Sequence, residues 1–226
     1  MMPLPLLRFE QLESTQTYLR DRPELGFCGV LADTQTAGRG RWGNSWESAA
    51  GTGFYFSAAV PDQGLPPGLA LQRAMLHAAR HLDPAGQTLG LKWPNDLVAR
   101  RGAGLVKLAG ILGEIQGERL LLGLGINLTA APDLPARAIP AASLVEVGLP
   151  VPNQAALAEA LLEGWQGLGE VRDPAFRWPV QGEAVRWEGG QGIVLGWEAD
   201  GRLRIANATG IQRLAGGEIA SIQPPA

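Results

Sequence analysis

The sequence predicts an α/β (or α+β) domain over residues 1–178, followed by a small all-β domain over residues 179–226. Three observations support this division. Apolar, strand-like runs and two amphipathic helical stretches fill the chain up to about residue 169. Residues 172–181 contain two prolines, which is typical of a linker. Residues 183–222 are short apolar runs separated by Gly-containing pairs.

The expected elements of the first domain follow one another in a simple order. A strand is expected near residues 4–9, after which Ser14 or Thr15 supplies a helix N-cap. Residues 26–32 predict a buried strand. Residues 54–60 are apolar on both faces, as in a strand of a sheet covered on both sides. Residues 68–82 carry an apolar stripe at helical spacing, and strands follow from about 88 to 128. A second helix is expected over residues 153–169, with Asn153 as its N-cap.

The C-terminal residues predict a small barrel. Asp200-Gly201 lies between two apolar runs, which is a strong hairpin signal. Gly189-Gly190 and Thr209-Gly210 punctuate the same stretch at similar intervals. Short strands at regular spacing, joined by tight turns, are typical of small barrels.

Composition excludes several classes of protein. The net charge of −3 gives no global basic field, so no DNA partner is expected. Cys28 is the only cysteine, which excludes a disulfide framework and a cysteine-built zinc site within one chain. No apolar run reaches the length of about 18 residues that would span a membrane, and no signal peptide is visible. A cytoplasmic location is therefore expected.

The loop over residues 33–53 is the most informative stretch for chemistry. It contains Gly38-Arg39-Gly40-Arg41-Trp42-Gly43-Asn44-Ser45-Trp46. Glycines expose backbone N–H groups, arginines bind phosphate or carboxylate in bidentate fashion, and tryptophans offer flat faces for a base. The pattern predicts a loop that binds phosphate beside an aromatic platform. A flexible surface loop is the alternative that the loop alone leaves open.

Two further segments carry charged residues in unusual places. Lys92-Trp93-Pro94-Asn95-Asp96 is a turn signal, but a hairpin explains only the Pro-Asn-Asp part. Lys107 stands at the entry of an apolar strand that also contains the acid Glu114. Edge positions on a surface strand would account for both of these residues without any function.

The strand over residues 120–128 has two different faces. Leucines and Ile126 alternate onto one face, which is expected to be pure core. Gly123, Gly125 and Asn127 alternate onto the other face, which is bare backbone ending in an amide. Glycine inside a strand costs stability and often marks the close approach of a ligand.

In combination these segments resemble biotin protein ligases. The resemblance rests on the order and spacing of five motifs over about the first 130 residues: Glu13-Ser14-Thr15-Gln16, the loop from Gly38 to Trp46, Lys92 to Leu97, Lys107 to Glu114, and Gly123-x-Gly125-x-Asn127. Gly217-Glu218-Ile219 resembles the end of that family's SH3-like domain. The resemblance implies a mixed-sheet catalytic domain of the biotin/lipoate ligase type and a C-terminal SH3-like β-barrel.

The resemblance also implies an activity. Such enzymes use ATP and Mg²⁺ to convert biotin to biotinyl-5′-adenylate, and then transfer biotin to one lysine of a biotin carboxyl carrier protein. The implied catalytic residues are Lys107, Arg39, Arg41 and Lys92. The implied biotin-binding residues are Ser14, Thr15, Gln35, Gly38, Arg39, Lys107, Gly110, Gly123 and Gly125. The implied adenylate-binding residues are Arg39, Arg41, Trp46, Asn95 and Asn127, and Asp96 is a candidate metal ligand.

The sequence departs from the family at several points, and other functions stay open. Asn44 and Ser45 stand where the family's loop commonly carries two cations. Only thirteen residues precede Ser14, so we expect the ligase-only form without a helix-turn-helix domain; a homodimer is compatible with it. The alternatives are a lipoate or octanoate ligase or transferase of the related fold, a nucleic-acid-binding module, and a biotin-binding protein without activity.

Overall fold

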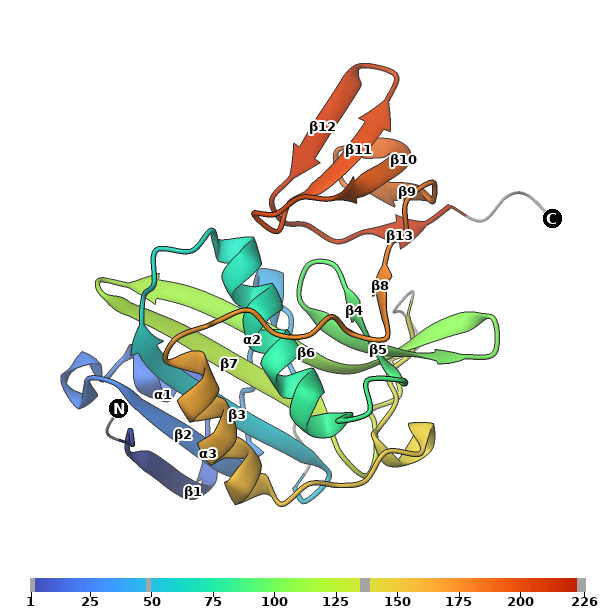
Figure 1. Ribbon diagram of the computed structural model, residues 1–226. Coiled ribbons are helices and arrows are strands. Elements are labelled where there is room, and N and C mark those ends of the chain that lie inside the picture. The colour runs from blue at the N-terminus through green and yellow to red at the C-terminus, as the bar shows by residue number, and fades with distance from the viewer. Residues whose placement is uncertain (1–2, 48–49, 135–138, 223–226) are drawn as a thin grey trace.

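The larger of two sheets in the computed structural model has eight strands, in the order β1-β2-β3-β7-β6-β5-β4-β8 (Figure 1). The structure describes residues 3–47, 50–134 and 139–222. The β1–β2 and β4–β8 pairs are parallel and the others antiparallel, so the predicted mixed sheet is confirmed. Its strands are β1 (Leu6–Leu12), β2 (Cys28–Gln35), β3 (Gly53–Pro61), β4 (Leu89–Lys92), β5 (Asp96–Arg101), β6 (Gly104–Gln116), β7 (Arg119–Asn127) and β8 (Phe176–Trp178).

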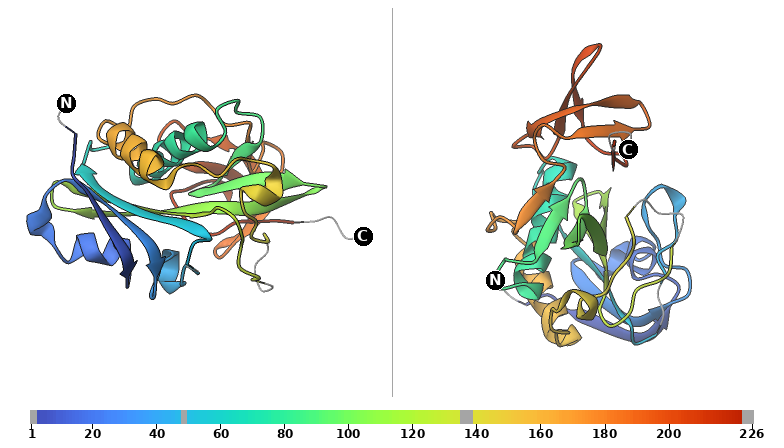
Figure 2. Two further views of the ribbon diagram at one scale, coloured as in Figure 1. Left: turned by 90° about the horizontal axis from the view of Figure 1, so that it is seen from below. Right: turned by 90° about the vertical axis from the view of Figure 1, so that its right-hand side faces the viewer.

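Helices cover the two faces of this sheet unequally. The long helices α2 (Pro67–Leu82) and α3 (Gln154–Trp165) lie on one face, and the short helix α1 (Thr15–Arg20) lies on the other (Figure 2, left). Leu122, Leu124 and Ile126 of β7 are buried in the core under α2 and α3. The predicted core face of this strand is therefore confirmed, and its bare glycine face lies on the side of α1.

The helix starts follow from capping side chains. Ser14 Oγ accepts the backbone N–H of Thr17 at 3.3 Å, and Asn153 Oδ1 accepts that of Ala156 at 3.0 Å. Each bond satisfies one of the N–H groups that a helix leaves unpaired in its first turn. Both predicted N-caps are therefore confirmed, although α3 ends at Trp165, four residues before its predicted end.

The C-terminal residues form a five-stranded antiparallel sheet in the order β12-β11-β10-β9-β13. Its strands are β9 (Ala184–Trp187), β10 (Gly190–Trp197), β11 (Leu203–Asn207), β12 (Gly210–Leu214) and β13 (Ala220–Ser221). The predicted barrel is not observed as a closed sheet in the described residues. The last strand has two residues and pairs with β9 alone, so the sheet ends there instead of returning to β12.

The two prolines predicted a linker over residues 172–181, but part of this stretch is a strand of the large sheet. Its residues Phe176–Trp178 form β8, which pairs in parallel with β4 at the edge of the large sheet. This short strand delivers the chain to the C-terminal sheet, which lies beyond the β4–β5 end of the large sheet (Figure 1).

Trp93 joins the two sheets. Its side chain is fully buried in a cluster with Val185, Val194 and Ile219 of the C-terminal sheet. The indole N–H donates to the carbonyl of Gly201 at 3.0 Å. The position of Trp93 in the turn between β4 and β5 is therefore explained by packing between the two sheets.

Among the described residues, no helix combines the length and the apolar character needed to cross a membrane.

Candidate active site

A cavity of about 790 Å³ lies over the glycine face of β7, between α1, the loop that follows β2, and the C-terminal sheet. It brings together every predicted site residue except Gly38. The predicted residues in its lining are Ser14, Thr15, Gln35, Arg39, Arg41, Trp46, Lys92, Asn95, Asp96, Lys107, Gly110, Gly123, Gly125 and Asn127. Segments from five parts of the sequence therefore meet in one place, as the resemblance implied.

One end of the cavity is a chain of hydroxyl and amide groups. The backbone N–H and the hydroxyl of Thr15 both donate to Gln35 Oε1, at 2.8 and 3.1 Å. Thr15 Oγ1 also lies 2.8 Å from Ser57 Oγ. Because the single hydroxyl proton of Thr15 is used for Gln35, Ser57 is the donor in that second bond. Thr15 and Ser57 are both buried, at 3% and 0% exposure.

Ser57 was not predicted as a site residue. It lies in β3 within the apolar run from Phe54 to Val60, which the sequence marks only as a buried strand. The available signal was a hydroxyl side chain in the middle of that run. A buried hydroxyl requires a hydrogen-bond partner, and the partner here is the start of α1.

The glycines of β7 open space for different neighbours. A Cβ at Gly123 would lie 2.6 Å from Gln16 Oε1 and 3.1 Å from Ser57 Oγ. A Cβ at Gly125 would lie 2.4 Å from the indole of Trp46. The structure therefore uses the room over Gly125 for Trp46, whereas the resemblance assigned that room to the ligand. Along the strand, two residues separate these positions by about 7 Å.

The other end of the cavity contains both lysines of the chain. Lys107 Nζ lies 2.8 Å from Asp96 Oδ1, and Lys92 Nζ lies 3.6 Å from Asp96 Oδ2. Lys92 and Asp96 are buried, whereas the Lys107 side chain is one third exposed. Lys107 Nζ is also 5.7 Å from the centre of the Trp46 ring. Lys107 is therefore the lysine that a ligand can reach directly.

The electrostatics of this cluster depend on burial. Burial lowers the pKa of Lys92, although the nearby Asp96 opposes that shift. Burial alone would raise the pKa of Asp96, but the charges of Lys107 and Lys92 outweigh it and hold that pKa below its usual value. The carboxylate therefore stays ionised and keeps two ammonium groups close together.

This arrangement does not fit a protein-built magnesium site. Both oxygens of Asp96 already face ammonium groups, and the described residues contain no cluster of three or more His, Cys, Asp or Glu side chains that could hold a metal ion. The role of Asp96 as a metal ligand stays a prediction. Its observed contacts are those of a residue that positions two lysines.

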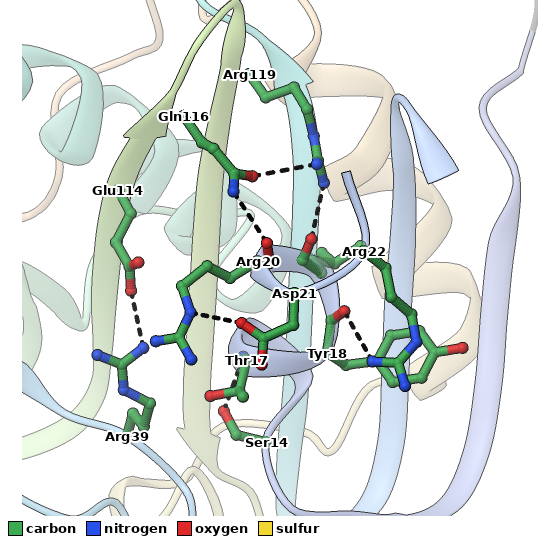
Figure 3. A network of polar contacts seen from close by, with 11 residues as sticks. Ser14, Thr17, Tyr18, Arg20, Asp21, Arg22, Arg39, Glu114, Gln116 and Arg119 are labelled. Carbon is green, nitrogen blue, oxygen red and sulfur yellow. Dashed lines mark hydrogen bonds and ion pairs between the residues drawn. The ribbon is translucent and has the colours of Figure 1, made fainter. Parts of the chain in front are cut away.

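The two arginines of the loop lie in different environments. Arg41 Nη1 donates to Asn95 Oδ1 at 3.0 Å and to the carbonyl of Gly217 at 3.4 Å. Burial lowers the pKa of Arg41. Arg39 instead forms an ion pair with Glu114 of β6 at 3.2 Å (Figure 3). Asn95 therefore positions Arg41 toward the cavity, and Glu114 holds Arg39 at its rim.

Gly38 and Asn127 each take part in a hydrogen bond to a backbone carbonyl that holds the cavity lining in place. The carbonyl of Gly38, which is outside the lining, accepts the N–H of Trp46 at 2.9 Å and closes the loop between them. Asn127 Nδ2 donates to the carbonyl of Ala142 at 3.1 Å. That bond ties the end of β7 to the segment that also pairs with Lys107.

The C-terminal sheet contributes to the cavity, which the sequence did not predict in residue detail. Arg186, Trp187 and Glu188 of the β9–β10 hairpin line it, as do Glu218 and Ile219 before β13. No local motif marks the hairpin residues as site residues, because their place over the cavity depends on how the two sheets pack. Only Gly217-Glu218-Ile219 carried a signal, as the end of a family domain.

Two side chains of the large sheet, Gln116 at the end of β6 and Arg119 at the start of β7, bind carbonyls at the C-terminal end of helix α1. Arg119 Nη2 donates to the carbonyl of Leu19 at 3.0 Å, and Gln116 Nε2 donates to that of Arg20 at 3.0 Å (Figure 3). Arg119 also donates to Gln116 Oε1 at 3.2 Å. A helix of six residues is too short to be stable alone, so these bonds and its packing hold its first turn over the cavity.

We expect Arg119→Ala to lower the free energy of unfolding by about 1–3 kcal/mol, because a buried carbonyl loses its donor. Denaturant titration measures the loss. Arg213→Ala is the matched control: Arg213 pairs with Glu198 at the surface, so we expect a loss of at most about 1 kcal/mol. Equal losses in the two variants would contradict the role given to Arg119.

Comparison with known proteins agrees with this geometry. The profile of the biotin/lipoate A/B protein ligase family matches residues 9–129. A Mycobacterium tuberculosis protein named biotin–[acetyl-CoA-carboxylase] ligase is 38% identical over 142 residues, which cover 59% of this chain and 50% of that protein. A Bacillus subtilis bifunctional ligase/repressor is 37% identical over 112 residues, covering 46% of this chain and 33% of that one.

Solved structures of Aquifex aeolicus biotin protein ligase have the same fold. A mutant form in complex with biotin has a TM-score of 0.74 and 25% identity, covering 99% of this chain and 100% of that chain. A complex with biotin and ATP has a TM-score of 0.73 and 24% identity, covering 97% and 99%. The match to the Mycobacterium tuberculosis relative spans about half of that protein's length. With more than half of its residues matched to the family profile, the chain belongs to the biotin/lipoate A/B protein ligase family.

Proposed function

We propose that this chain is a biotin protein ligase. It would join biotin and ATP to form biotinyl-5′-adenylate, and then transfer biotin to one lysine of a biotin carboxyl carrier protein. The observation that carries the proposal is the single cavity with a buried polar end at Thr15 and Ser57 and a cationic end at Lys107. Such a cavity suits a small acid whose head group forms hydrogen bonds and whose tail ends in a carboxylate.

The first half-reaction needs fixed cations. A carboxylate oxygen attacks the α-phosphorus of ATP, a bond from phosphorus to oxygen forms, and pyrophosphate leaves with the electrons of the bond that breaks. Because both reactants are anions, their approach requires positive charge already in place. Lys107 would contact the carboxylate and the α-phosphate, and Arg41 and Arg39 would contact the phosphates. The buried Lys92, which pairs with Asp96, would add a further positive charge nearby.

The second half-reaction transfers the acyl group. The amine of the carrier lysine attacks the carbonyl carbon of the adenylate, AMP leaves, and the nitrogen loses a proton. The remaining roles follow the resemblance. Ser14, Thr15, Gln35, Gly110 and Gly123 would hold biotin. Trp46, Asn95 and Asn127 would hold the adenylate, with Trp46 leaving the space over Gly125 as the ligand enters.

The C-terminal unit takes part in this proposal. We assign residues 1–178 to a catalytic domain and residues 179–226 to an SH3-like domain, in which the end of β9 and the segment leading into β13 form one rim of the cavity. Arg186 and Glu218 line the cavity from that rim. The carrier lysine would enter beside them. A carrier domain is the expected protein partner.

Lipoate is the closest alternative substrate within the family. Its dithiolane head group has no N–H and no carbonyl, so the polar groups at Thr15 and Ser57 would face it without forming hydrogen bonds. Biotin carries a cyclic urea that can satisfy them.

A nucleic-acid-binding module is disfavoured, because the cations at the site are few and lie inside a cavity instead of on a basic surface.

Exchange of label between pyrophosphate and ATP tests the proposal. We expect exchange with purified chain and biotin, and none with biotin omitted. Lipoate serves as the matched control acid. Exchange with lipoate alone would assign the chain to the other branch of the family, and exchange with neither acid would overturn the ligase proposal.

A further inference from the structure

Gln16 is a buried amide of the cavity that the predicted ligand set does not include. It lies in the first turn of α1, lines the cavity and is 3% exposed. Its Nε2 donates to the carbonyl of Leu121 in β7 at 3.4 Å. A carbonyl only accepts, so this contact decides which end of the amide faces the strand. Oε1 consequently faces away from Leu121.

The free end of this amide borders the space over Gly123. A Cβ at Gly123 would lie 2.6 Å from Gln16 Oε1, so the oxygen lies directly beside the bare strand. Oε1 is buried, and no donor in the described part of the chain lies within hydrogen-bond distance of it. Folded proteins rarely leave a buried carbonyl oxygen without a donor. A donor from a ligand is therefore the natural partner.

A second acceptor borders the same space. Ser57 Oγ would lie 3.1 Å from a Cβ at Gly123, and its proton is already used in the bond to Thr15. A lone pair of Ser57 therefore remains to accept. Two oxygen acceptors around one glycine define a site that favours a ligand with N–H groups and disfavours one with oxygen or sulfur at the same place.

We propose that Gln16 Oε1 accepts a hydrogen bond from one ring N–H of a cyclic urea, which makes Gln16 a specificity-determining residue. This inference rests on the proposed function, because biotin supplies the cyclic urea. It adds a side chain of α1 to the recognition of the ligand. A side chain at position 123 would clash with this amide oxygen, so the glycine there is required for Gln16 to keep its position.

The test compares biotin with two cyclic carbamate analogues, each with a ring oxygen in place of one N–H. Dissociation constants are measured by calorimetry for the unsubstituted chain and for Gln16→Met. For each protein, the dissociation constant of an analogue is divided by that of biotin. For one of the two analogues, we expect this ratio to be about 10- to 100-fold larger in the unsubstituted chain than in Gln16→Met. The ratio for the other analogue is expected to stay the same in both proteins.

Two variants control for folding. Gln72→Met removes a buried amide that bonds to the carbonyl of Gly201 away from the cavity, so it should leave both ratios unchanged. Gln16→Asn keeps an amide but withdraws its oxygen by one methylene, and it replaces Gln16→Met if that variant does not fold. We expect it to reduce the same ratio.

The outcomes separate the two proposals. If the unsubstituted chain binds biotin and both ratios survive substitution of Gln16, the role of Gln16 is overturned and the ligase proposal stands. If the unsubstituted chain does not bind biotin, the ligase proposal falls and this inference falls with it. A ratio that changes equally for both analogues would indicate a general disturbance of the cavity and would also overturn the specific hydrogen bond.

Discussion

Lys107→Ala is expected to lower the rate of biotin-dependent pyrophosphate exchange by about 10²–10³-fold, which is typical for the loss of one fixed cation at a developing charge. Lys107 is the lysine that remains one third exposed in the cavity, and its ammonium group lies 2.8 Å from Asp96. The loss should appear mainly in the maximal rate, because the cation acts where two anions meet.

The matched control is Arg186→Ala, which removes a cation that lines the cavity from the C-terminal sheet. We expect a much smaller effect on exchange, because we place Arg186 beside the entry of the carrier lysine. Near-full exchange by Lys107→Ala would remove Lys107 from the catalytic residues. An equal loss in both variants would indicate that only the total charge of the cavity matters.

Asp96→Ala is expected to lower the free energy of unfolding by about 3–5 kcal/mol, because it leaves Lys92 as a buried charge without its counter-ion. Lys92 and Asp96 are 6% and 8% exposed, so solvent screens the pair only weakly. Denaturant titration measures the loss. The double variant Asp96→Ala with Lys92→Met should recover much of it, because no buried charge then remains.

An exposed ion pair gives the control for this prediction. Asp173 pairs with Arg177, and its side chain is 77% exposed, so Asp173→Ala should lower the free energy of unfolding by at most about 1 kcal/mol.

The pKa of Asp96 is held below its usual value, so the stabilising effect of Asp96 is present above about pH 4 and is lost as the pH falls through the lowered pKa. A small loss in Asp96→Ala, unaffected by the Lys92 substitution, would contradict this account.

The sequence predicted those parts of the fold that depend on local pattern. The alternation along β7 assigned Leu122 to the core and Gly123 to the open face, and Ser14 and Asn153 were identified as helix caps. Side-chain periodicity and capping are local properties, so they are visible in a single sequence. The motifs also predicted which segments meet, because a family resemblance carries information on distant contacts.

The parts that were missed depend on how elements pack. Trp93 lacked an explanation until the C-terminal sheet placed Gly201 beside its indole. The open edge of that sheet follows from the two-residue length of β13, which turn signals do not specify. Ser57 and Gln16 gained their importance only from what lies across from them. A side chain whose partner is distant in sequence gives no local signal.

The presence of only two lysines in the chain has a chemical consequence for an enzyme of this kind. An acyl adenylate that escapes its cavity reacts with any free amine it meets. Lys92 is buried and Lys107 is held by Asp96 inside the cavity, whereas the other basic side chains apart from two histidines are arginines, whose guanidinium groups stay protonated. Outside the cavity the chain therefore offers no lysine side chain to capture the activated acid.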